Sequence, residues 1–297
     1  MKFIDLFAGI GGFHLALHRL RGKCVFASEI DSHARKTYEI NHSKISPDLF
    51  KDNLFNKDIT EIPKSSISTV IPDFDLLCGG FPCQPFSQAG YKKGFNDDRG
   101  NLFFHIANII EEKNPKAFLL ENVRHLLNHD EGKTFTVIKD ILNNLGYSFY
   151  FKVIKASDFG LPQLRPRVYM VGFKNDTLNE FEFPSPIPLE MTMSDIFGGE
   201  CTREIGFTLR VGGRSSPIDD RRNWDGYWVN GEVRRLSPIE GLKMLGFPDS
   251  FEFPVTNAQA MKQLGNSVAV PVVEAIAGNI KQYIEILESK ELLKYGT

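Results

Sequence analysis

The 297-residue sequence has few cysteines and no long hydrophobic run. Cys24, Cys78, Cys83 and Cys201 form no CxxC pair and have no histidine at metal-site spacing, so neither a disulfide framework nor a zinc site is expected. No apolar stretch reaches the roughly 20 residues needed to span a bilayer. The first residues read as a strand where a signal peptide would stand. The sequence therefore predicts a cytoplasmic protein without a metal and without membrane contact.

An excess of charge of one sign is also lacking, because 35 Lys and Arg balance 37 Asp and Glu and the formal net charge is -2. This balance argues against a protein that coats nucleic acid non-specifically, although it allows a local basic groove. Arginines interleaved with aromatic residues gather late in the chain, at Arg203, Arg210, Arg214, Arg221, Arg222, Arg234 and Arg235 with Trp224, Tyr227 and Trp228. Acidic residues in the same stretch make a solvated surface an equal alternative to a nucleic-acid surface.

Apolar segments alternate with helical patterns in the first part of the chain. Strands are predicted over 3–8, 23–28, 75–78, 117–120, 148–154 and 168–173, with helices over 13–21, 32–41, 102–113 and 134–145. This alternation predicts the α/β class with a doubly wound, mostly parallel, Rossmann-like sheet. The composition shifts at a proline-rich linker over 183–188, and the helical pattern returns over 269–287. We predict a larger domain (1–180 and 262–297) and a smaller, irregular lobe (181–261).

Cys83 follows one of these predicted strands, inside the glycine- and proline-rich run GGFPCQPFS over 79–87. Open α/β sheets bind ligands at the carboxyl ends of their strands, and a cysteine thiolate is a strong nucleophile. A small buried side chain is the usual alternative for an isolated cysteine. Pro82 and Pro85 in a polar loop make burial less plausible, so Cys83 is the candidate nucleophile.

A second strand runs directly into Glu121 and Asn122, which brings a carboxyl group to the same edge. A carboxyl that stays partly protonated in an apolar site can donate a proton to a ring nitrogen. Together with Cys83, this group suits attack on an electron-poor heterocycle.

Glycines join the first strand to the first helix in the segment DLFAGIGGF over 5–13, and they allow close backbone approach to a ligand at the helix N-terminus. His14 stands where the dinucleotide fingerprint has its third glycine, which disfavours a pyrophosphate. Glu29 ends the second strand about 20 residues on, where a carboxylate usually takes ribose hydroxyls. A nucleotide-like cofactor is predicted.

Two further residues are candidates for contact with an adenine ring. Asp58, with Ile59, can end a third strand and reach the adenine amino group. A solvated aspartate beside a core isoleucine is an equal alternative. Phe7 can cover an adenine face, although a phenylalanine on a strand is more often part of the core.

The assembled motifs resemble the cytosine-C5 DNA methyltransferases of bacterial restriction-modification systems over nearly the whole chain. The matching segments are DLFAGIGGF (5–13), PCQ (82–84), ENV (121–123), QLRPR (163–167), RRLSP (234–238) with LGFP (245–248), and QLGNSV (263–268). Lys57 is a departure, because the family often has glycine before the aspartate. The segment between 174 and 233 is short for the family, which is consistent with a compact recognition lobe and a short target.

The resemblance implies methyl transfer from S-adenosyl-L-methionine to C5 of a cytosine flipped out of duplex DNA, with S-adenosyl-L-homocysteine as product. Cys83 would add to C6 and Glu121 would assist at N3. Arg165 would hold the cytosine O2 and Arg167 would orient Glu121. Residues 87–100, with glycine hinges, would close over the flipped base.

The residue sets implied by this resemblance are as follows. The catalytic set is Cys83, Gln84, Glu121, Asn122, Arg165 and Arg167. The cofactor-binding set is Asp5, Phe7, Gly9, Gly11, Gly12, Glu29, Ile30, Asp58, Ile59, Pro82, Leu102, Asn266 and Val268. The DNA-binding set is Ser87, Gln88, Arg99, Thr208, Arg210, Arg214, Arg221, Arg222 and Arg234.

The expected partner is double-stranded DNA, bound by a monomer in the bacterial cytoplasm at the nucleoid. A restriction endonuclease would be a functional partner without forming a stable complex. A transfer-RNA methyltransferase of the same architecture is disfavoured, because those relatives carry Cys-Phe-Thr where this chain has Cys201-Thr202-Arg203. The presence of Cys83, Glu121 and Arg165 argues against an inactive DNA-binding or regulatory relative. A nicotinamide-dependent oxidoreductase is disfavoured because the third glycine is missing. The DNA recognition sequence does not follow from these patterns.

Overall fold

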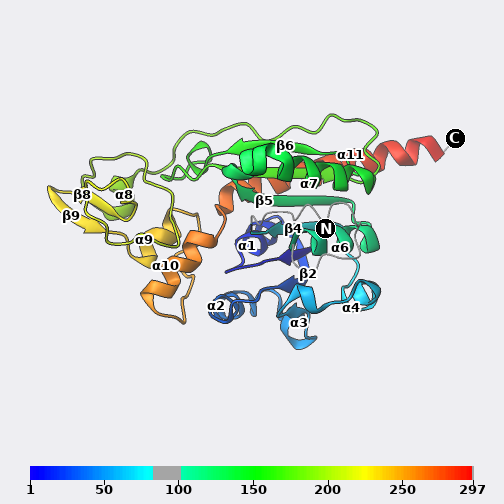
Figure 1. Ribbon diagram of the computed structural model, residues 1–297, viewed down its shortest axis with the longest axis horizontal. Helices are drawn as coiled ribbons and strands as arrows, with labels where there is room; N and C mark the ends of the chain where they lie inside the picture. Colours follow the sequence, from blue (N-terminus) through cyan, green and yellow to red (C-terminus); the bar gives the residue numbers. More distant parts are fainter. Residues whose placement is uncertain (83–101, 296–297) are drawn as a thin grey trace.

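The computed structural model describes residues 1–82 and 102–295. A 7-stranded sheet with the order β3-β2-β1-β4-β5-β7-β6 forms its centre (Figure 1). The strands are β1 (Lys2–Leu6), β2 (Lys23–Ser28), β3 (Phe55–Asn56), β4 (Leu76–Gly80), β5 (Ala117–Val123), β6 (Tyr150–Ile154) and β7 (Arg167–Phe173). Strands β1 to β5 are parallel, whereas β7 runs antiparallel to β5 and β6. The prediction of a mostly parallel α/β sheet is confirmed.

Helices cover both faces of this sheet, which is why its strands are apolar on both sides. These helices are α1 (Gly12–Arg19), α2 (Ser32–His42), α3 (Pro47–Lys51), α4 (Ile67–Val70), α6 (Leu102–Lys113), α7 (Lys133–Asn144) and α11 (Val270–Tyr295). Phe3 packs into one buried cluster with α1 and α11, while the next residue, Ile4, packs into a second cluster with α6 and α7. The doubly wound arrangement is therefore confirmed, and none of the described helices is long and apolar enough to cross a membrane.

The strand order reverses between β1 and β4, and this point decides where a ligand can bind. In open α/β sheets the crevice opens outside the carboxyl ends of the strands at such a switch. The register pairs Leu6 of β1 with Gly79 of β4, and Gly80 of β4 with Glu121 of β5. The first glycine turn, the segment before Cys83 and the Glu121 carboxyl thus share one edge.

The smaller lobe lies at the left end of the molecule in Figure 1. It contains α8 (Met193–Phe197), the hairpin β8 (Gly226–Val229) and β9 (Glu232–Arg235), and α9 (Pro238–Lys243), and it leads into α10 (Asn257–Asn266). Trp224 and Tyr227 belong to its core, whereas Trp228 is 41% exposed. The boundary predicted at residue 262 falls inside α10, and the division into domains stays a prediction.

The third strand is shorter than the sequence suggested. It ends at Asn56, two residues before Asp58, so the prediction that Asp58 and Ile59 end this strand was wrong. The Asp58 carboxylate instead caps the 3-10 turn Ile59–Glu61, because its Oδ1 accepts from Thr60 N at 2.9 Å and from Thr60 Oγ1 at 2.7 Å. An aspartate that bonds its own local backbone competes with a strand ladder.

Candidate active site

A cavity of about 510 Å³ opens at the carboxyl edge of the sheet. We call it the edge cavity. The sequence-predicted residues that line it are Phe7, Gly9, Glu29, Ile30, Asp58, Ile59, Pro82, Leu102, Glu121, Asn122, Arg165, Arg167 and Asn266. They come from segments far apart in the sequence, and the sheet register brings them together.

Four of the expected cofactor residues lie outside this lining: Asp5, Gly11, Gly12 and Val268. Asp5 is fully buried, and burial, with a smaller effect of the Glu29 charge, raises its pKa well above the usual range. A Cβ on Gly12 would lie 2.6 Å from the Val268 side chain. Gly12 thus lets the start of α1 pack closely on the segment between α10 and α11.

Cys83, Gln84, Ser87, Gln88 and Arg99 lie outside the described residues, as does the segment 87–100 that was expected to close over the base. Pro82 and Leu102, the described residues on either side of this segment, both line the edge cavity.

Glu121 and Arg167 form an ion pair in the wall of the edge cavity. Glu121 is 8% exposed, and its Oε1 lies 2.9 Å from Arg167 Nε. Burial raises the pKa of this carboxyl, while the charges of Arg167 and Arg165 act in the opposite direction. A Cβ on Gly80 would lie 3.4 Å from Glu121 Oε2, so the glycine keeps the space beside the carboxyl open. The Glu121 carboxyl, oriented by Arg167, can share a proton with a ring nitrogen placed in the cavity.

Asn122 ties the end of β5 to the segment that precedes Cys83. Its Nδ2 donates to Phe81 O at 2.8 Å, and its Oδ1 accepts from Val123 N at 2.8 Å. Both bonds go to backbone groups, and the side chain is buried. The structure therefore supports a positioning role for Asn122, in place of the catalytic one expected from the sequence.

Arg165 also differs from the expectation. Its guanidinium donates to Leu209 O at 3.3 Å, to Gly265 O at 3.0 Å and to Ser267 O. The residue is 2% exposed, and burial lowers its pKa to about 9, so it remains charged near neutral pH. Its Nε is buried and has no hydrogen-bond partner among the described residues, and Arg165 lines the edge cavity. The expectation that Arg165 holds the cytosine O2 therefore stays a prediction.

The other end of the edge cavity fits a nucleotide-like cofactor. Glu29 accepts from Gly9 N at 2.7 Å through Oε2 and from Asp31 N at 2.8 Å through Oε1, while burial raises its pKa. Ile30 lines the same wall and is 61% exposed, which offers an apolar face to a flat ring. Phe7 has φ 55°, an uncommon backbone conformation for a bulky residue that occurs mainly at functional turns.

The comparisons with known proteins agree with this geometry. The family model described as C-5 cytosine-specific DNA methylase matches residues 1–208 and 200–282. The chain belongs to this family. It is therefore a DNA (cytosine-5-)-methyltransferase, from a family that uses S-adenosyl-L-methionine.

Two curated relatives and one solved structure illustrate the similarity. Type II methyltransferase M.SsoII of Shigella sonnei is 41% identical over 314 residues, which cover 94% of this chain and 79% of that protein. Type II methyltransferase M.HhaI of Haemophilus parahaemolyticus is 38% identical and covers 94% of both chains. A DNMT2 structure from Spodoptera frugiperda has a TM-score of 0.72 at 21% identity, covering 94% of this chain and 99% of that one. This last likeness shows the fold alone.

The sequence reasoning missed a polar link at the rim of the methyltransferase's edge cavity. Lys262 Nζ on α10 lies 3.4 Å from Asp31 Oδ2, and both residues line the cavity. Asp31 also caps α2 by accepting from His33 N and Ala34 N. An N-cap pattern directly after Glu29 was readable in the sequence, but its partner from α10 was not.

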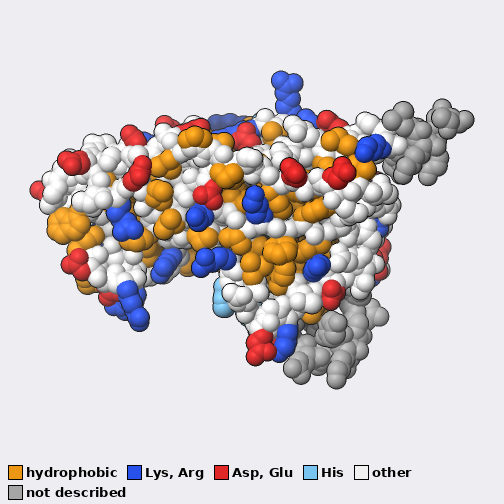
Figure 2. Space-filling view, turned by 90° about the horizontal axis from the view of Figure 1, so that it is seen from above, with side chains coloured by type: hydrophobic (Ala, Val, Ile, Leu, Met, Phe, Trp, Pro, Cys, Tyr) orange, Lys and Arg blue, Asp and Glu red, His pale blue; other side chains and the backbone are white. Residues whose placement is uncertain are grey.

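A notch separates the smaller lobe from the larger domain of the methyltransferase. Figure 2 shows this notch from above, with Lys and Arg side chains along its roof and its left side. The local basic groove that a net charge of -2 allowed is therefore present. A polyanion can bind there.

Proposed function

We propose that this methyltransferase transfers a methyl group from S-adenosyl-L-methionine to C5 of a flipped-out cytosine in a short duplex DNA target, through a covalent adduct between Cys83 and C6. The observation that carries the proposal is the buried Glu121–Arg167 pair beside the strand end that leads into Cys83. Asn122 bonds the backbone two residues before Cys83, which supports delivery of the thiol to the same cavity.

The chain's own residues account for activation of the base. The Cys83 thiolate forms a bond to C6 while Glu121 gives or shares a proton at N3, so that the electron pair moves to C5. The cofactor, when bound, supplies an electrophilic methyl group on a positively charged sulfur. After C5 is methylated, loss of the C5 proton and cleavage of the bond between Cys83 Sγ and C6 release the methylated base.

The two arginines of the 163–167 segment have different roles. Arg167 lies beside Glu121 in the cavity wall, so we assign it both the orientation of Glu121 and the contact with the base oxygen. Arg165 holds three backbone carbonyls and is a positioning residue. This assignment differs from the one expected from the sequence, because Arg167 is the arginine paired with Glu121, whereas three Arg165 bonds go to backbone carbonyls.

The cofactor would be held at the opposite end of the edge cavity. Glu29 would accept hydrogen bonds from the ribose hydroxyls. Phe7 and Ile30 would contact the adenine ring, and Asp58 and Asn266 line the same cavity. The Glu29 carboxylate is already oriented by two backbone N–H groups, so binding requires little reorganisation.

Base flipping follows from the position of the site. C5 and C6 of a stacked cytosine are inaccessible, so enzymes that act on a base extrude it from the duplex. The basic notch is a suitable seat for that duplex. The type II relatives support a restriction endonuclease as the functional partner, and we propose a monomer on DNA in the bacterial cytoplasm.

The test uses S-adenosyl-L-methionine with a labelled methyl group, offered with duplex DNA or with transfer RNA. We expect label only in DNA, at C5 of cytosines in one short sequence. Cys83→Ser should abolish transfer while keeping cofactor affinity, because an alcohol is a far weaker nucleophile than a thiolate near neutral pH. Label in transfer RNA, or near wild-type turnover of the serine variant, would contradict the proposal.

A further inference from the structure

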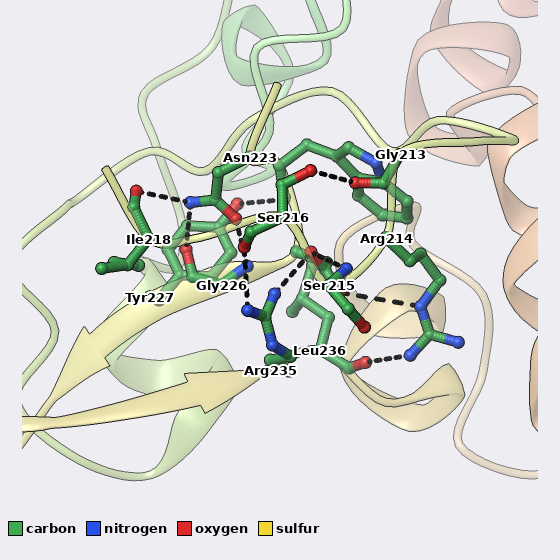
Figure 3. A network of polar contacts seen from close by, with 12 residues as sticks. Gly213, Arg214, Ser215, Ser216, Ile218, Asn223, Gly226, Tyr227, Arg235 and Leu236 are labelled. Atoms are coloured by element: carbon green, nitrogen blue, oxygen red, sulfur yellow. Dashed lines mark hydrogen bonds and ion pairs between the residues drawn. The ribbon is translucent and has the colours of Figure 1, made fainter. Parts of the chain in front are cut away.

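The smaller lobe is organised around a buried carboxylate, Asp225, which is 0% exposed. Its Oδ1 lies 3.0 Å from Arg235 Nη1 and its Oδ2 lies 3.7 Å from Arg214 Nε, while Ser215 N donates to both oxygens at 3.2 Å. Figure 3 shows Arg214, Ser215 and Arg235 beside one another at the loop before β8. Arg214 Nη2 also donates to Leu236 O at 3.3 Å. A buried charge requires such partners, so Arg214 is part of the framework of the lobe.

The same loop is fixed at its next residues by further internal bonds. Trp224 Nε1 donates to Gly212 O at 2.7 Å, and Ser216 Oγ donates to Gly213 O at 3.0 Å. Arg235 Nη2 donates to Ser216 O at 2.8 Å. The backbone over 212–216 is therefore held by Trp224 and Asp225, which precede β8, by Arg235 of β9 and by the loop itself.

Hydrogen bonds from the 163–167 segment hold the residues just before this loop. Gln163 Oε1 accepts from Leu209 N at 3.1 Å, and Arg165 donates to Leu209 O at 3.3 Å. A Cβ on Gly265 would lie 2.7 Å from the Arg210 carbonyl carbon. The Arg210 backbone thus passes directly over Gly265, which lines the edge cavity.

The exposed arginines of the lobe divide into two classes. Arg222 donates to both Asp220 oxygens, at 3.0 and 2.8 Å, and Arg234 donates to Phe197 O at 2.9 Å. Within the part of the chain that the structure describes, Arg203, Arg210 and Arg221 form no hydrogen bond or ion pair, and Arg203 stacks over the Phe207 ring. Of these three, Arg210 is the one whose backbone lies against Gly265 in the wall of the edge cavity.

We propose that Arg210 is the specificity-determining residue of the smaller lobe, and that its guanidinium bonds a guanine edge in the DNA groove beside the target cytosine. The inference rests on the proposed DNA substrate. Arginine can bond guanine O6 and N7 in pairs, and a backbone fixed on both sides reduces the freedom that binding must remove. Arg214 and Arg235 support the loop from inside.

The experiment is selection of duplexes from a randomised pool, with S-adenosyl-L-homocysteine present and binding as the readout. The wild-type chain is expected to select one short sequence. Arg210→Ala should bind that sequence about 5- to 150-fold more weakly and lose the preference at one position. Lys139→Ala is the control, because it removes an exposed cation on α7 of the larger domain, and it should select the wild-type sequence.

Other outcomes overturn the inference. Equal weakening of all sequences by Arg210→Ala, with a smaller salt dependence, identifies a phosphate contact. An unchanged preference excludes any reading role, and so does a wild-type chain that selects no sequence. The thermal unfolding midpoint of Arg210→Ala should match the wild type, because the side chain has no internal bond, and a large drop would indicate a structural role instead.

The binding readout separates this inference from the proposed function. If the wild-type chain selects a sequence and Arg210→Ala relaxes it, but the selected DNA is never methylated, the inference holds and the proposed function fails. If the selected DNA is methylated while Arg210→Ala keeps the full preference, the proposed function holds and the inference fails.

Discussion

The larger domain and the smaller lobe place their buried carboxyl groups in opposite ways. Glu121 and Glu29 stand at strand ends and line a cavity, whereas Asp225 is enclosed by Arg214 and Arg235. Burial without full pairing raises the pKa of the two glutamates. A carboxyl that lines a cavity stays available to a ligand even where one guanidinium pairs with it, as Arg167 does with Glu121, while the fully buried Asp225 between two guanidinium groups stabilises the fold.

The two regions also differ in how they form a core. The larger domain buries apolar strands on both faces of a sheet. The smaller lobe has a two-stranded hairpin, and its long loop depends on the polar network around Asp225. Variants of the first region should change chemistry and cofactor affinity, and variants of the second should change DNA selection. The following predictions test that separation.

The largest effect is expected from Glu121→Gln in the larger domain. General acid assistance is typically worth about 10² to 10⁴ in rate, so methyl transfer should fall by that factor, as measured by single-turnover kinetics. The DNA sequence preference should stay the same. A loss below tenfold would remove Glu121 from the acid role.

Asp225→Asn in the smaller lobe should act on stability and selection. It keeps the side-chain shape but leaves two guanidinium groups without their buried counter-charge. Removing one partner of a buried pair costs roughly 3–5 kcal/mol, and we expect about 3 kcal/mol because the guanidiniums are about one-third exposed. Denaturant unfolding and duplex selection provide the measurements. Cofactor affinity should be unchanged. An equal loss of cofactor affinity would contradict the separate roles of the two regions.

Glu29→Ala should weaken cofactor binding while leaving DNA affinity unchanged. Hydrogen bonds to charged groups contribute about 1.5–3 kcal/mol, so titration calorimetry should show roughly 10- to 100-fold weaker S-adenosyl-L-methionine binding. Glu39→Ala, an exposed carboxylate on the neighbouring α2, is the control. Equal affinities for both variants would exclude Glu29 from the cofactor site.

Acid should destabilise the larger domain through protonation of His42 in the unfolded state. The smaller lobe contains no histidine, so it has no group of this kind. His42 stacks on His14 at 4.3 Å, and its Nε2 lies 3.1 Å from Ile10 O in the cofactor turn. Burial lowers its pKa to about 4, below the ordinary value near 6.5, so only the unfolded state takes up this proton as the pH falls from about 6.5 to 4.

Stability should therefore fall by about 1.4 kcal/mol per pH unit in that window for this residue. Denaturant unfolding at several pH values, compared between wild type and His42→Gln, isolates the contribution from that of His14, which has the same sign, and from Asp5, which has the opposite sign. Identical slopes for the two proteins would show that His42 is not held neutral.

Many residues that line the edge cavity were predictable, because the end of an apolar strand can be located in a sequence. The apolar run before Glu121, and the glycines between the first strand and α1, place those residues at the carboxyl edge once the sheet is parallel. Asp58 shows where this reasoning fails. Its own side chain ended the strand early by bonding Thr60, and a two-residue strand has too little periodicity to reveal its end.

The sequence by itself determined the fold class and the candidate catalytic cavity, because hydrophobic periodicity and glycine turns are local properties of the chain. Only the tertiary structure decided which charged side chains face a ligand. Arg165 bonds carbonyls that lie 44, 100 and 102 residues away, and Arg214 pairs with the buried Asp225 carboxylate just before β8. Backbone carbonyls carry no residue signature, so an arginine that holds the fold and one that is free to read DNA, such as Arg210, look the same until the chain is folded.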